Sequence, residues 1–82
     1  MNNNYKFNPD NYHGILGLSE GLSNFYNSFE IYRDNKSKEN WFGFRRKWED
    51  VFFTIKHRET EGNLNPVTAN EMRDYLEVLI ND

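Results

Sequence analysis

Cysteine is absent from this chain of 82 residues, so neither a disulfide nor a reactive thiolate can contribute to its stability or chemistry. Zinc sites built on cysteine are excluded for the same reason. No apolar run approaches the roughly 18–20 residues of a membrane-spanning helix, and the N-terminus lacks the apolar stretch of a signal peptide. We therefore expect a cytoplasmic protein, in the cytoplasm of the host cell if the chain is phage-encoded, with no membrane contact.

Positive charge is also in short supply, because the formal net charge is -3. The whole chain therefore has no general attraction for nucleic acid or for anionic lipid, and any such binding needs a local basic patch. What is abundant is aromatic side chains, which make up 17% of the residues. Since a domain this small buries only about 60% of its unfolded surface, large rings must supply much of the core.

Apolar residues at alternating spacings of three and four predict two helices. The first covers about residues 20–33, with the glycine at position 17 marking a break before it. The second is the longest and covers about residues 38–60, with Ser37 as its N-cap and Gly62 as its stop signal. Its predicted inner stripe consists of Trp41, Phe44, Trp48, Val51, Phe52 and Ile55.

The third helix has the pattern of a capping box, in which Thr68 and Glu71 satisfy each other's free backbone donors. Val67 and Met72 occupy the two positions of a hydrophobic staple, so this helix is expected to start at residue 69. At the other end of the chain, residues 1–8 resemble a flexible or strapped-down arm. Pro9 follows this arm and could open a short N-terminal helix.

Three amphipathic stripes joined by short polar turns predict an all-α fold, a small three-helix bundle with up-down-up connectivity, with that short N-terminal helix as an extra element. Residues 1–82 form one domain in this interpretation. The main alternative is an α+β fold in which Asp50 to Lys56, rich in phenylalanine, valine and threonine, forms a strand.

Residues that could carry catalysis are sparse. His13 and His57 are the two histidines, and they do not have the spacing of metal ligands on a helix. Glu49 and Asp50 are adjacent, so on a helix they diverge and cannot share one site. The glycines form no phosphate-binding pattern. We expect no enzyme activity, no metal and no cofactor.

The most basic stretch of the chain offers a second interpretation, a nucleic-acid-binding face on the long central helix. Cations are interleaved there with aromatic rings, an arrangement that proteins use to bind single-stranded nucleic acid. Arg45 and Arg46 can each pair with an acid four residues further on, which would neutralise much of this charge. The cations involved are Arg45, Arg46, Lys47, Lys56 and Arg58.

Phe42 and Phe53 do not fit the inner stripe of the long helix. At about 100° per residue they lie close together in angle, some three turns apart along the axis, with Arg46 and Glu49 between them. The arm with Tyr5 and Phe7, or the turn around Tyr12 and Leu16, could cover these rings within the monomer. If neither does, two exposed rings with an arginine between them are typical of protein interfaces.

The sequence therefore favours a small acidic protein-binding module, such as a phage or mobile-element regulator or inhibitor of a larger host protein. Its partner would be another protein of unknown identity or a second copy of the chain in a homodimer, with nucleic acid as the alternative. The predicted partner-binding residues are Phe42, Arg45, Arg46, Glu49, Phe53 and Lys56.

Overall fold

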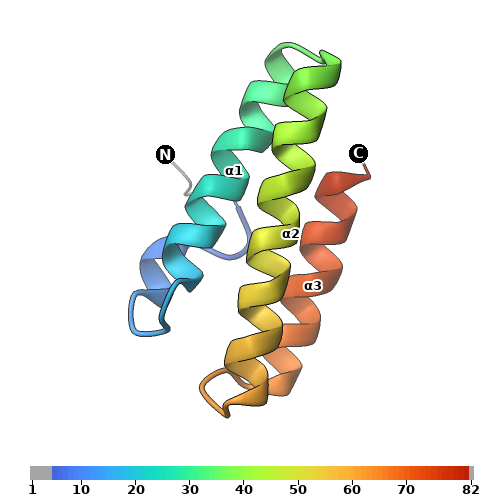
Figure 1. Ribbon diagram of the computed structural model, residues 1–82. Helices are drawn as coiled ribbons and strands as arrows, with labels where there is room; N and C mark the ends of the chain where they lie inside the picture. The colour runs from blue at the N-terminus through green and yellow to red at the C-terminus, as the bar shows by residue number, and fades with distance from the viewer. Residues whose placement is uncertain (1–4, 82) are drawn as a thin grey trace.

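The computed structural model describes residues 5–81, so residues 1–4 of the predicted arm lie outside the described part. A short 3-10 turn, η1 (Pro9–Tyr12), precedes three helices, α1 (Leu18–Asp34), α2 (Lys38–Thr60) and α3 (Pro66–Ile80). The helices run alternately up and down side by side (Figure 1). The predicted all-α three-helix bundle is confirmed. The alternative with a strand at Asp50 to Lys56 is wrong, because these residues lie inside α2.

The ends of α2 lie where the sequence predicts them. The Ser37 hydroxyl accepts a hydrogen bond from the Asn40 amide at 3.1 Å, which satisfies one of the free donors of the first turn. At the other end Gly62 has a φ of 83°, a left-handed conformation that glycine adopts without steric cost. The Asn63 amide then donates to the Arg58 carbonyl at 2.9 Å, which closes the helix in a Schellman motif.

The predicted start of α3 is wrong by three residues. The helix begins at Pro66 and not at residue 69, and Asn65 is its cap, with its side-chain oxygen accepting from the Val67 amide at 2.8 Å. Proline at the first position has its φ already set for the helix and has no amide hydrogen left unpaired. The Asn-Pro pair therefore starts the helix before the capping box at Thr68 is reached. The predicted staple is not formed either, because Val67 is 66% exposed.

The core lies between the inner faces of the three helices and is largely aromatic. Gly21 on α1 lets the two long helices approach closely, since a Cβ at that position would lie 3.2 Å from a methyl group of Val51 on α2. The buried apolar side chains are Phe7, Leu18, Leu22, Phe25, Tyr26, Phe29, Phe44, Val51, Ile55, Leu64, Ala69, Met72 and Leu76.

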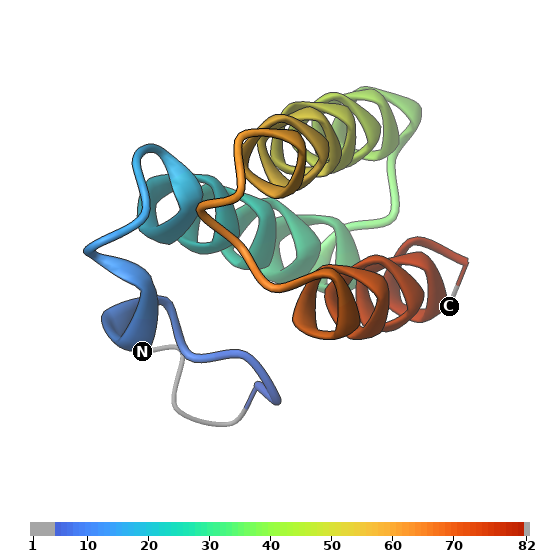
Figure 2. The same ribbon diagram turned by 90° about the horizontal axis from the view of Figure 1, so that it is seen from below.

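The described part of the N-terminal arm packs between α1 and α3, on the side of α1 that faces away from α2 (Figure 2). The Tyr5 ring stacks on Tyr26 of α1 with 3.9 Å between centroids, and the Tyr26 hydroxyl donates to the Phe7 carbonyl at 2.8 Å. The Lys6 amide donates to the hydroxyl of Tyr75 on α3 at 3.1 Å. The arm therefore joins two helices that are distant in sequence. Pro9 follows it as the first residue of η1, as predicted.

A pair of substitutions tests which residue caps α3. Asn65→Ala should lower the free energy of unfolding by about 1 kcal/mol, because it leaves the Val67 amide without its partner. The matched change Thr68→Ala should alter it by less than about 0.5 kcal/mol, since Thr68 lies inside the helix. Urea unfolding followed by circular dichroism measures both, and a larger loss for Thr68→Ala than for Asn65→Ala would contradict the observed cap.

The arm also predicts a loss of stability in alkali. Burial raises the pKa of the Tyr26 hydroxyl, and burial together with the hydrogen bond to Glu30 raises the pKa of Tyr5. The unfolded chain releases these protons near pH ~10 and the folded chain only at higher pH, so the stability is full below pH ~10 and falls as the pH rises above it. In urea titrations, the double variant Tyr5→Phe/Tyr26→Phe should lose less stability between pH ~9 and ~11 than the unaltered protein. Equal losses would contradict the prediction.

Candidate functional site

The outer side of α2 presents two phenylalanines to solvent. Phe42 is 64% exposed and Phe53 is 63% exposed, whereas Phe44, Val51 and Ile55 of the same helix are buried. At about 100° per residue, Phe42 and Phe53 lie within about 20° of each other and nearly opposite the buried side chains. Figure 2 shows that none of the described segments runs over the side of α2 that faces away from α1 and α3.

The predicted covering segments do not reach these rings. The arm packs on α1 and α3, and Tyr12 contacts Phe7 of that arm with 6.5 Å between ring centroids. Leu16 is itself 76% exposed. Within the described part of the chain, both phenylalanines therefore remain uncovered, and the interpretation in which the monomer hides them is wrong.

All of the residues predicted to bind a partner lie on this side of α2, and all are exposed. We call them the outer face: Phe42, Arg45, Arg46, Glu49, Phe53 and Lys56. The Arg45 Nε lies 3.5 Å from Glu49 Oε2, and both side chains are about half exposed. The Arg45 guanidinium also lies over the Trp48 ring, 5.5 Å from its centroid. These contacts orient Arg45 toward the edge of the outer face.

The second ion pair expected on α2, between Arg46 and Asp50, is not formed. Among the described residues the ion pairs of α2 are Arg45–Glu49, Arg58–Glu61 and, to α3, Glu59–Arg73. The guanidinium of Arg46 is therefore available to a group from another molecule. It lies between the two exposed rings along the helix, which is where an interface would place a specific polar contact.

His57 belongs to this surface but was not predicted. His57 contacts Phe53 edge to face, with 6.3 Å between ring centroids, and it is exposed. Its position four residues after Phe53 places it on the same side of the helix, so this spacing could have predicted it. His57 extends the outer face toward the C-terminal end of α2.

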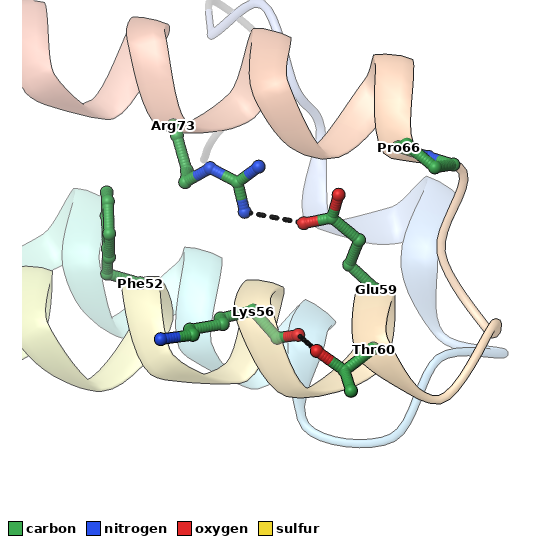
Figure 3. A pocket seen from close by; sticks show the side chains of 6 residues that line it. All are labelled: Phe52, Lys56, Glu59, Thr60, Pro66 and Arg73. Atoms are coloured by element: carbon green, nitrogen blue, oxygen red, sulfur yellow. Dashed lines mark hydrogen bonds and ion pairs between the residues drawn. The ribbon is translucent and has the colours of Figure 1, made fainter.

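A depression of about 630 Å³ lies beside the outer face, between α2 and α3 (Figure 3). Within it Arg73 Nη1 donates to Glu59 Oε1 at 2.8 Å, so these two charges satisfy each other. Lys56 belongs both to the lining of this depression and to the outer face. We regard the depression as the junction between two packed helices, whose ion pair links α2 to α3. Its lining residues are Phe52, Lys56, Glu59, Thr60, Pro66 and Arg73.

Metal-binding clusters and membrane-spanning helices were also sought among the described residues. Residues 5–81 contain no group of three or more histidine, aspartate or glutamate side chains that could hold a metal ion. His13 lies 3.5 Å from Asp10 on an exposed turn. None of the helices described combines the length and the apolar composition needed to cross a bilayer.

Comparisons of this chain with protein-family models, curated proteins and solved structures find no match.

The exposure of the outer face predicts a contrast in stability. At low protein concentration, Phe42→Ala and Phe53→Ala should each change the free energy of unfolding by less than about 1 kcal/mol, because little buried contact is lost. Phe44→Ala should cost about 3–5 kcal/mol, because it leaves a cavity in the core. Thermal or urea unfolding of the three variants checks this. A loss above about 2 kcal/mol for Phe42→Ala or Phe53→Ala would show that the ring is packed within the monomer.

Proposed function

We propose that this chain is a small acidic protein-binding module that acts in the cytoplasm as a regulator or inhibitor of a larger protein, and that it binds through the outer face of α2. The observation that supports this most strongly is the pair of phenylalanines exposed on one face, 64% for Phe42 and 63% for Phe53. Aromatic side chains and arginine are enriched in protein interfaces and account for much of their binding energy.

The charges of the outer face favour a protein partner over nucleic acid. Arg45 and Glu49 form an ion pair on this face, and Arg58 is paired with Glu61 at 3.0 Å. Two of the five cations that would bind phosphates are therefore already engaged. The chain as a whole is negative, with a formal net charge of -3. A surface of mixed sign with exposed rings suits a protein surface better than a polyanion.

The mode of action follows from the size of the module. A chain of 9.9 kDa that presents one such face acts on a larger protein by occupying part of its surface. Occupation of this kind blocks or alters what the larger protein does there. This is the physical basis for proposing a regulator or inhibitor.

The proposal is tested by immobilising the protein and measuring what it retains from an extract of its source cells. The double variant Phe42→Ala/Phe53→Ala should retain at least tenfold less of the partner protein, because the two anchoring rings are gone. The matched control is Val67→Ala/Val78→Ala, which removes two exposed apolar side chains from α3 and should retain the partner fully. Quantitative mass spectrometry of the eluates gives the readout, with added unaltered protein as competitor.

Two results would contradict the proposal. One is equal retention by the outer-face variant and the unaltered protein. The other is retention of nucleic acid in place of protein, with binding that weakens steeply as salt rises and that is lost on Arg46→Ala.

A further inference from the structure

The outer face of α2 has an internal symmetry. Along the helix the order is Phe42, Arg46, Glu49 and Phe53, with spacings of four, three and four residues. The order is symmetric about the point midway between positions 47 and 48. The rings of Phe42 and Phe53 stand at equal distances on the two sides of that point. The opposite charges of Arg46 and Glu49 also stand at equal distances from it, and they lie between the two rings.

Two copies of α2 placed antiparallel, with their midpoints together, bring complementary groups into register, ring against ring and cation against anion. Phe42 then lies beside Phe53 of the second copy, and Arg46 lies beside Glu49 of the second copy. A two-fold axis generates each of these contacts twice, as in an isologous dimer. The four-three-four spacing is that of the core positions of a coiled coil, so the four side chains fall on one seam.

The residues next to the seam support the same register. With a rise of about 1.5 Å per residue, Glu49 comes near Arg45 of the second copy on one side of the seam. Arg46 comes near Asp50 of the second copy on the other side. Arg46 and Glu49 therefore each have an opposite charge from the other chain within reach of their side chains, and the guanidinium of Arg46 gains an ionic partner that residues 5–81 of its own chain do not supply.

The parallel arrangement is disfavoured by the same charges. With two parallel copies in register, Arg46 would meet Arg46 and Glu49 would meet Glu49 at the centre of the contact. Like charges in such positions cost binding free energy and act against that arrangement. In the antiparallel pair the two Arg46 side chains, and likewise the two Glu49 side chains, are offset by about 4.5 Å along the axis, and each of them lies nearer to an opposite charge. Lys38 and Lys56 approach each other only at the two ends, where water and salt screen them.

We infer that the outer face of α2 binds a second copy of this chain, forming an antiparallel homodimer with α2 against α2. This inference rests on the proposed function because it uses the same binding face, which the second copy occupies when no larger protein is bound there. The contact is one helix on one helix, which is at the small end of specific interfaces, so we expect a dissociation constant on the order of 1–100 μM. A larger protein that used the same face would compete with the second copy.

Charge reversal at the centre of the seam gives a sharp test. Arg46→Glu brings two carboxylates together across the seam, because the new side chain lies beside Glu49 of the second copy. Glu49→Arg brings two guanidinium groups together in the same way. The dissociation constant of the homodimer should therefore rise at least tenfold for each variant alone. Mixed in equal amounts they should form a heterodimer, because each chain then supplies the charge that the other needs. The control Glu71→Arg reverses an exposed charge on α3 and should dimerise like the unaltered protein.

The readout is sedimentation equilibrium over roughly 1 μM to 1 mM, a range that brackets the expected dissociation constant. The unaltered protein should approach twice the monomer mass of 9.9 kDa, and circular dichroism confirms that each variant is folded. Dimerisation of Arg46→Glu as strong as that of the unaltered protein, or no gain on mixing the two variants, would overturn the inference.

The orientation is tested with a spin label. The chain contains no cysteine, so Thr60→Cys gives a single labelling position near the end of α2. The antiparallel dimer separates the two labels by about 37 Å along the axis, from about 1.5 Å per residue, whereas a parallel dimer places them within roughly 15 Å, close to the spacing of two packed helices. A short distance by pulsed electron resonance would overturn the antiparallel arrangement.

The outcomes separate this inference from the proposed function. If the unaltered protein stays monomeric up to about 1 mM and a different protein is retained through Phe42 and Phe53, the homodimer is overturned and the binding module stands. If the protein is monomeric and the outer-face variant also retains everything that the unaltered chain retains, both are overturned.

Discussion

A helix that packs on two neighbours can bury only part of its circumference, and α2 carries more large rings than that part can hold. Phe44 occupies the buried face together with Val51 and Ile55, and Trp48 is half-buried beside them. With about 100° per residue, this choice of inner face forces Phe42 and Phe53 to the opposite side of the helix. The exposed aromatic surface is therefore a geometric consequence of how the core is built.

The N-terminal arm explains why that surface stays open. Its rings are used to join α1 and α3, where Tyr5 stacks on Tyr26 and Phe7 is buried. The hydrogen bonds from Tyr26 to Phe7 and from Lys6 to Tyr75 hold the arm there. A small domain with no disulfide gains buried aromatic area in this way. The segment best able to cover the outer face is thus engaged on the far side of the bundle.

The features that local spacing determines could be predicted from the sequence. The limits of α2 follow from the Ser37 cap and the Gly62 stop. The glycine at position 17 predicted the break before α1, and it takes a left-handed conformation there, with a φ of 78°. The prediction for the start of α3 was wrong because two cap signals compete within one turn, and the Asn-Pro pair comes first in the chain. Both signals are strong, and spacing alone does not rank them.

The position of the arm could not be predicted, because its contacts join residues 19 to 69 positions apart. Periodicity carries no information at that range. For the same reason, the side of α2 on which Phe42 and Phe53 lie was predictable, but their exposure was not. Exposure depended on whether a distant segment covered them.

Whether a second copy binds the outer face of α2 can be measured residue by residue by NMR during dilution. Amide spectra of the unaltered protein recorded from roughly 1 mM to 10 μM span the expected dissociation constant. The antiparallel dimer should give concentration-dependent shifts confined to one side of α2, around Phe42, Arg46, Glu49 and Phe53. Spectra that do not change with concentration, or changes centred on the arm or on α3, would contradict it.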